Sequence, residues 1–248
     1  MVKYKVSAVS YLNTIPFIYG LKNSPIFDHI ELSLDFPALC ADKLLKGQVD
    51  IGLVPVAVIP KLQHPHIISD YCIGANGAVD TVCLYSDVPI SEIDSIALDY
   101  QSHTSVELLK ILLREYWYLN PELKNAEIGF EDSIKGKYAA LVIGDRSFEL
   151  NTKYRYIYDL SAIWKQMTGL PFVFATWVAN TKLPQDFIID FNKALEKGLS
   201  DMQKALNFEG DNYPNCKNPE DYLNNRISYV LDAEKKKGME LFLNKINY

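Results

Sequence analysis

Apolar and polar positions along this chain follow the pattern of a mixed α/β protein. Residues 5–9 form a short apolar run that predicts a strand, and residues 50–54 form a second run that stops before Pro55. Ahead of the second run, Pro37 suits the first turn of a helix and Gly47 suits its end. A helix, a tight turn and a buried strand in this order are half of a parallel-sheet unit.

The pattern continues through the rest of the chain. Four further apolar runs predict strands at residues 79–86, 95–98, 139–143 and 172–178. Thr104 and Glu107 fit a capping box at the start of a helix. From Pro184 onward the spacing is helical, and a last helical stretch is predicted from Pro219, with a break near Gly238.

The chain shows no repeat, no low-complexity segment and no Gly/Ser-rich linker. Two domains joined by a flexible tail would show such a linker, whereas two domains joined by crossing strands would not. We therefore predict two α/β lobes with a ligand cleft between them. Residues 1–86 and 177–248 form a discontinuous outer lobe, residues 87–176 form an inserted lobe, and the chain crosses near residues 82–90 and 172–180.

Composition narrows the function classes. Of 248 residues, 48% are hydrophobic and 23% are charged, which is typical of a globular protein, and the net charge of −6 argues against a nucleic-acid partner. No apolar stretch has the length of a membrane span, and the first residues do not resemble a signal peptide, so a cytoplasmic protein is expected. The cysteines form no C-x-x-C pair, and no metal or cofactor motif is visible. Formation of a homodimer is left open.

The candidate site residues lie after predicted strands or at a predicted helix start. Ligands bind beyond the carboxyl ends of strands in open α/β sheets, and helix N-termini attract anions. The candidates are Ser10, Tyr11, Asn13, Thr81, Ser102, Thr104, Ser105, Gly144 and Asp145. Hydroxyl, amide and backbone N–H groups dominate this set, so the residues alone predict a site for a small anion.

Each candidate also has a purely structural interpretation. Thr104 caps a helix as readily as it binds a ligand, and Asp145 is either a general acid or base or a partner of nearby amides. His103 is more often a solvated loop residue than a general base. Trp164 and Phe172 line a cleft or belong to the core.

Five blocks of the sequence are distinctive when they are taken together. They are VSYLNTIPF (9–17), GQVDIGLVP (47–55), LDYQSHTSVELLKILL (98–113), LVIGDRSF (141–148) and YDLSAIWKQMTGLPFVFATWV (158–178). In this order they resemble the chorismate dehydratases of the futalosine route to menaquinone. The combination of SYLN with TGLPFVFA is specific, and the resemblance covers roughly residues 4–180 in order. Val56 and Ala57 depart from it, because relatives carry serines after the proline of the second block.

The resemblance implies a two-lobed periplasmic-binding-protein-like type II fold and dehydration of chorismate to 3-[(1-carboxyvinyl)oxy]benzoate without a cofactor. It implies catalytic roles for Asn13 and Asp145 and binding of the dianionic substrate by the other candidates, with Thr81 at a position where a serine or threonine is expected. Asn13 would orient a carboxylate or the leaving hydroxyl. The proton acceptor is either the substrate's own enolpyruvyl carboxylate or Asp145.

Two alternative functions follow from the same residues. The first is the dihydroxynaphthoate synthase of the same pathway, although the SYLN opening favours the dehydratase. The second is a non-catalytic protein that binds a small anion.

Overall fold

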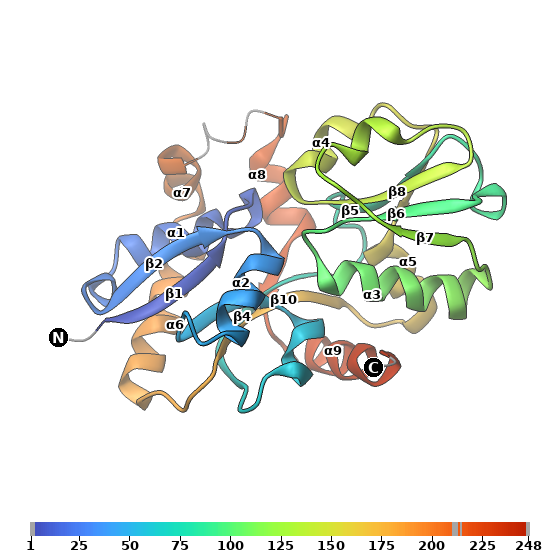
Figure 1. Ribbon diagram of the computed structural model, residues 1–248. Helices are drawn as coiled ribbons and strands as arrows, with labels where there is room; N and C mark the ends of the chain where they lie inside the picture. The colour runs from blue at the N-terminus through green and yellow to red at the C-terminus, as the bar shows by residue number, and fades with distance from the viewer. Residues whose placement is uncertain (1–2, 210–212, 214, 247–248) are drawn as a thin grey trace.

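The strands of the protein form two separate sheets in the computed structural model, which describes residues 3–209, 213 and 215–246. The six-stranded sheet has the order β11-β4-β10-β3-β1-β2, and the five-stranded sheet has the order β7-β6-β8-β5-β9. Figure 1 shows the two sheets side by side. The strands are β1 (Tyr4–Val9), β2 (Ile30–Asp35), β3 (Ile51–Pro55), β4 (His66–Ala75), β5 (Val82–Ser86), β6 (Ser95–Leu98), β7 (Glu122–Asn125), β8 (Tyr138–Ile143), β9 (Tyr156–Asp159), β10 (Phe172–Ala179) and β11 (Ser228–Val230).

Helices cover both sheets. They are α1 (Ile15–Lys22), α2 (Pro37–Leu45), α3 (His103–Leu112), α4 (Ser147–Leu150), α5 (Leu160–Thr168), α6 (Gln185–Ser200), α7 (Met202–Glu209), α8 (Pro219–Asp221) and α9 (Ala233–Lys245). Helices α1 and α6 approach very closely at Gly198, where an added Cβ would lie 1.7 Å from the Pro16 carbonyl oxygen. Glycine is therefore needed at this crossing because any side chain would separate the two helices.

The chain passes between the sheets twice. It leaves the six-stranded sheet after β4 through residues 76–81, and it returns through α5 and residues 169–171 to enter β10. Strand β5 thus belongs to the five-stranded sheet, and all of β10 belongs to the six-stranded one. The division into two lobes stays a prediction. If each lobe is built on one sheet, the lobe boundaries fall near residues 76–81 and 160–171, which is before the predicted crossings at residues 82–90 and 172–180.

The predicted capping box and the predicted last helix are wrong in detail. Ser102, not Thr104, is the N-cap of α3, because the Ser102 hydroxyl accepts the Ser105 backbone N–H at 3.1 Å. The C-terminal stretch does not break at Gly238. Strand β11 interrupts it instead, and α9 runs through Gly238, where an added Cβ would meet the Pro171 carbonyl oxygen at 2.2 Å.

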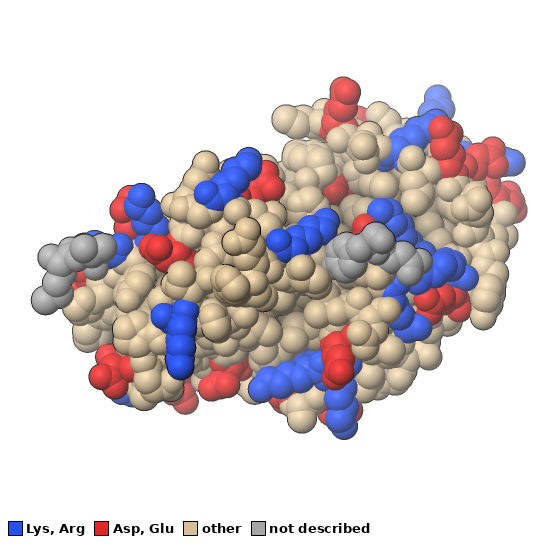
Figure 2. All heavy atoms as spheres, turned by 60° about the horizontal axis from the view of Figure 1, so that its bottom comes forward, with Lys and Arg blue, Asp and Glu red and all other residues tan. Residues whose placement is uncertain are grey.

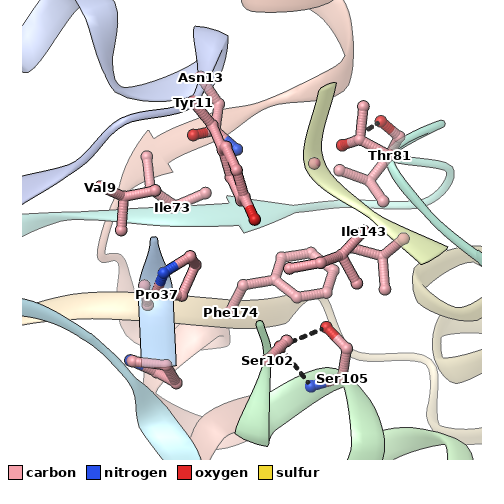
Figure 3. Close-up of a pocket in the computed structure, with 15 residues that line it drawn as sticks. Val9, Tyr11, Asn13, Pro37, Ile73, Thr81, Ser102, Ser105, Ile143 and Phe174 are labelled. Carbon is pink, nitrogen blue, oxygen red and sulfur yellow. Dashed lines mark hydrogen bonds between the residues drawn. The ribbon is translucent and has the colours of Figure 1, made fainter. Parts of the chain in front are cut away.

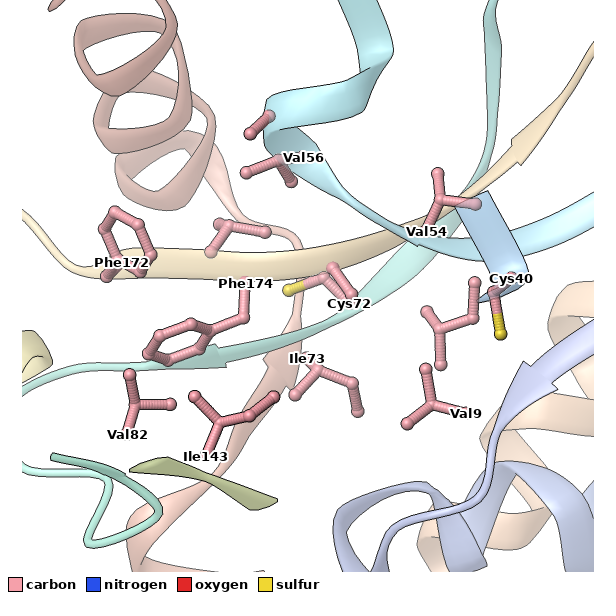
Figure 4. Packing of buried hydrophobic residues seen from close by; sticks show 14 of the residues in the cluster. Val9, Cys40, Val54, Val56, Cys72, Ile73, Val82, Ile143, Phe172 and Phe174 are labelled. Carbon is pink, nitrogen blue, oxygen red and sulfur yellow. The ribbon is translucent and has the colours of Figure 1, made fainter. Parts of the chain in front are cut away.

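Trp164 and Phe172 belong to the core rather than to a cleft. Both are almost fully buried, and their ring centroids lie 5.4 Å apart. Figure 4 shows part of the same apolar cluster, in which Phe174 lies toward Val82 and Ile143 from the opposite sheet. Residues of both sheets therefore share one apolar interior that continues across the boundary between them.

The described surface carries mixed charge. On the face shown in Figure 2, Lys and Arg side chains are interspersed with Asp and Glu side chains. Within the described part of the chain, no helix combines the length and apolarity needed to cross a bilayer.

Candidate functional site

A cavity lies where the ends of strands from both sheets meet. It contains about 500 Å³ of empty space, counting its mouth toward solvent. Figure 3 shows Tyr11 and Asn13 entering it from one side and Ser102 and Ser105 from the opposite side. The lining residues are Val9, Tyr11, Asn13, Pro37, Pro55, Ile73, Val79, Thr81, Val82, Ser102, Ser105, Ile143, Gly144, Phe174 and Ala175. None of these residues is charged, so polar contacts inside would come from neutral hydroxyl, amide and main-chain groups.

The first turn of α3 presents two serines to the cavity. Ser102 caps the helix, and its hydroxyl lies 2.9 Å from that of Ser105. The N–H groups of a first helical turn have no intrahelical acceptor, and the helix dipole favours a negative charge there. This side of the cavity is therefore suited to a carboxylate.

Thr104 lies in the same turn but is turned away from the cavity. Its hydroxyl accepts the backbone N–H of Ala57 at 3.2 Å, and neither residue lines the cavity. Thr104 thus anchors the loop after β3 to the start of α3. We predicted Thr104 as a substrate-binding residue. In the structure its hydroxyl makes this anchoring contact with Ala57.

Tyr11 extends into the cavity against the backbone of Gly144. Gly144 has φ of +69°, and a Cβ built on it would lie 2.6 Å from the Tyr11 ring. The Tyr11 hydroxyl donates to the side chain of Gln101, in the loop before α3, and the Gln101 carbonyl accepts the Ala38 N–H at 3.0 Å. Burial, followed by the charge of Asp99, raises the pKa of Tyr11, so the phenol stays neutral.

Asn13 and Thr81 form the polar end of the cavity. The Asn13 side-chain oxygen accepts the Thr14 hydroxyl at 3.0 Å, and its main-chain carbonyl accepts the Tyr229 hydroxyl at 3.0 Å. The Thr81 hydroxyl lies 2.8 Å from that of Tyr222. Both tyrosines come from the C-terminal segment, which the sequence patterns did not connect with the site.

Asp145 lies beside the cavity without lining it. Both of its carboxylate oxygens accept the backbone N–H of Leu12, at 3.1 and 3.2 Å. Burial raises the pKa of Asp145 to about 7, although the bond from Leu12 acts in the opposite direction. Near neutrality this carboxyl group can therefore either hold or release a proton.

A buried ion pair supports the two loops that face Tyr11. Arg146 donates to Asp99 at 2.6 Å and also pairs with Glu131. Asp99 in turn accepts the backbone N–H groups of Gln101 and Ile143, each at 2.9 Å. The strand ends of β6 and β8 are thus tied together directly behind the cavity.

The structure brings most of the predicted site residues together. Six of them line the cavity: Tyr11, Asn13, Thr81, Ser102, Ser105 and Gly144. Three do not: Ser10, Thr104 and Asp145. The backbone of Ser10 holds the C-terminal segment, since the Ser10 carbonyl accepts the Tyr213 hydroxyl at 3.1 Å. His103 is exposed and does not line the cavity; it lines a second hollow beside α3 that Ser102 also borders.

Gln101, Tyr222 and Tyr229 were not among the predicted site residues. Gln101 directly precedes the predicted Ser102, and its contact with Tyr11 joins residues 90 positions apart. Among the described residues, no group of three or more His, Cys, Asp or Glu side chains is placed to hold a metal ion.

Comparisons with known proteins agree on one family and one fold. The model of a family described as menaquinone biosynthesis matches residues 4–248. A chorismate dehydratase of Thermus thermophilus is 27% identical over an alignment of 226 positions, and the match covers 83% of this chain and 81% of that protein. A protein of Archaeoglobus fulgidus has a similar structure, with a TM-score of 0.72 at 13% identity, covering 98% of this chain and 96% of that one.

A Candida albicans protein described as having the generic periplasmic-binding-protein fold also superposes well. Its TM-score is 0.65 at 10% identity, and the match covers 98% of this chain and 90% of that one. At this identity the likeness concerns the fold alone. The fold is thus α/β and periplasmic-binding-protein-like.

Proposed function

Because the chain belongs to the menaquinone-biosynthesis family, we propose that it is a chorismate dehydratase, a cytoplasmic hydro-lyase that makes 3-[(1-carboxyvinyl)oxy]benzoate. The observation that carries this proposal is the family match along residues 4–248, together with the dehydratase of Thermus thermophilus among the relatives. The periplasmic-binding-protein-like fold also fits a small substrate.

The cavity supports the proposal by its chemistry. Chorismate carries one carboxylate on its ring and one on its enolpyruvyl side chain, and the cavity offers apolar walls with neutral donors at both ends. Ser102, Ser105 and the first turn of α3 are suited to one carboxylate. Asn13 and Thr81 are suited to the other carboxylate or to the leaving hydroxyl.

The reaction requires the protein to orient the substrate more than to supply a strong acid or base. The C3–H bond breaks, and its electron pair spreads toward the ring carboxylate, to which C3 is vinylogous. The electrons then form the new ring double bond as the C4 hydroxyl leaves, and the abstracted proton and the hydroxyl account for one water. Since the product ring is aromatic, the step is strongly downhill, and preorganised donors supply what remains.

We assign the proton transfer to the enolpyruvyl carboxylate of the substrate itself. Asp145 does not line the cavity, and its two oxygens share the single N–H of Leu12, which supports a role beside the reacting atoms. Its pKa of about 7 nevertheless makes it the alternative acceptor. Asn13 is then the catalytic residue that orients a carboxylate or the leaving hydroxyl.

The test is incubation of the purified chain with chorismate, following the loss of water by mass spectrometry and the gain of aromatic absorbance. Formation of 3-[(1-carboxyvinyl)oxy]benzoate at a rate proportional to protein concentration supports the proposal. Chorismate binding without product would indicate a non-catalytic binder. Conversion of a cyclised futalosine derivative instead of chorismate would indicate the dihydroxynaphthoate synthase.

A further inference from the structure

A tyrosine from the far end of the chain is placed directly behind the polar end of the cavity. Tyr222 begins a π-helical turn after α8, and its side chain is 4% exposed. Its hydroxyl lies 2.8 Å from the Thr81 hydroxyl, which belongs to the segment that crosses between the sheets. The Tyr222 ring packs edge-on against Phe148 with centroids 5.1 Å apart, so the hydroxyl has a fixed direction.

The hydrogen atoms at this end of the cavity can be assigned from the partners of each group. The Asn13 side-chain oxygen accepts the Thr14 hydroxyl at 3.0 Å, and its NH₂ group is the donor of this side chain. Burial raises the pKa of Tyr222, and hydrogen bonds with the Thr81 and Asn13 side chains act in the opposite direction. Because the Thr81 hydroxyl donates to the Val79 carbonyl at 3.4 Å, the hydrogen between the Tyr222 and Thr81 oxygens comes from Tyr222.

We propose that Tyr222 is a positioning residue that acts through Thr81: it donates to the Thr81 oxygen and thereby leaves the Thr81 hydrogen to donate to an anionic oxygen of the substrate. The inference rests on the proposed function, since it concerns the same cavity. In the structure the Thr81 hydrogen is directed to the Val79 carbonyl at 3.4 Å, a long contact that an anionic oxygen of the substrate can replace. Without the Tyr222 hydroxyl, the Thr81 oxygen loses the donor that fixes it, and the substrate loses one preorganised donor.

The test is a double-mutant cycle on the full chain with chorismate as substrate. Tyr222→Phe keeps the ring against Phe148 and removes only the hydroxyl. We expect kcat/KM to fall about tenfold in Tyr222→Phe and about as much in Thr81→Val, because each loses the same oriented donor. In the Thr81→Val background, Tyr222→Phe should cost no further activity. A merely structural role of the hydroxyl would lower activity equally in both backgrounds.

Tyr158→Phe is the matched control, since the Tyr158 hydroxyl accepts the Ile90 N–H at 2.7 Å in a place away from the cavity. Its kcat/KM should equal that of the wild type. Wild-type activity in Tyr222→Phe, or equal losses in both backgrounds, overturns the inference and leaves the proposed function intact. A folded wild-type chain that leaves chorismate unchanged overturns the proposed function and the inference with it.

If Tyr222→Phe does not fold, the activities of Thr81→Ser and Thr81→Val are compared instead. Serine keeps the hydroxyl beside Tyr222, so Thr81→Ser should retain activity that Thr81→Val loses. Equal losses in these two variants would contradict the role of the Thr81 hydroxyl and overturn the inference.

Discussion

The carboxylate of Asp145 accepts the backbone N–H of Leu12 across the boundary between the two sheets, with N–O distances of 3.1 and 3.2 Å. Leu12 follows β1 of the six-stranded sheet, and Asp145 follows β8 of the five-stranded sheet. Burial raises the pKa of this carboxyl group to about 7. A contact between the two halves of the molecule therefore depends on a group that titrates near neutral pH.

The first prediction concerns stability and pH. The folded-state pKa of Asp145 is raised above its unfolded value, so the folded chain binds this proton more tightly. The corresponding stability is fully present below pH about 4 and is lost as the pH rises to about 7. Compared with Asp145→Asn, the wild type should lose up to about 1.4 kcal/mol of unfolding free energy per pH unit in that window. Urea unfolding of both proteins across the window measures this difference.

Asp28→Asn serves as the control, because Asp28 is an exposed carboxyl group far from the cavity lining. Its pH dependence should match that of the wild type. A difference between wild type and Asp145→Asn that is constant with pH would contradict the assigned titration of Asp145.

The second prediction concerns Gly144. Alanine there would be strained, because φ is +69°, and its Cβ would collide with the Tyr11 ring at 2.6 Å. We expect Gly144→Ala to lose about 1–3 kcal/mol of unfolding free energy and most of its activity, since Tyr11 must leave its place in the cavity. Denaturant unfolding and the chorismate assay measure the two effects.

Gly169→Ala is a matched variant, with φ of +74° and no atom within 4 Å of the added Cβ. It should show the backbone strain alone, about 1 kcal/mol, with activity unchanged. If the two variants lose the same activity, then the Tyr11 contact is not what Gly144 provides.

Six strands, β1, β3, β5, β6, β8 and β10, were predictable because they are apolar runs in the sequence, whereas β2, β4, β7, β9 and β11 were not predicted. β8 is a buried apolar run, and the loop after it begins with Gly144, so both were visible in the sequence. Tyr222 was not, since its contact with Thr81 joins residues 141 positions apart and no periodicity marks it. The contact of Thr104 with the Ala57 N–H was not visible in the sequence for a similar reason, because Ala57 lies in a distant loop.

The third prediction concerns the start of α3. Ser102→Ala removes the cap of the Ser105 N–H and one lining hydroxyl, so it should cost about 1 kcal/mol of stability and also raise KM for chorismate. His103→Ala is the neighbouring control, and the exposed His103 lies outside the cavity lining. Its kcat and KM should equal those of the wild type. A rise of KM in His103→Ala comparable to that in Ser102→Ala would contradict the placement of the cavity.

The fourth prediction separates the two proton acceptors. Asn13→Ala should lose on the order of a hundredfold or more in kcat while it still binds chorismate, because a preorganised neutral donor acts mainly where charge develops. Asp145→Asn should be milder, since its carboxylate accepts the Leu12 N–H and an amide oxygen can do the same. Asn125→Ala, on the exposed edge strand β7, should leave kcat unchanged.

The substrate provides the complementary half of this test. A chorismate analogue without the enolpyruvyl carboxylate should bind and fail to eliminate water, because it lacks the assigned proton acceptor. Rates from single-turnover experiments and affinities from calorimetry distinguish binding from chemistry. If the analogue reacts while Asp145→Asn abolishes turnover in a folded, chorismate-binding protein, the acceptor is Asp145. Its pKa of about 7 would then appear as the ascending limb of the pH–rate profile, since only the ionised carboxylate can take the proton.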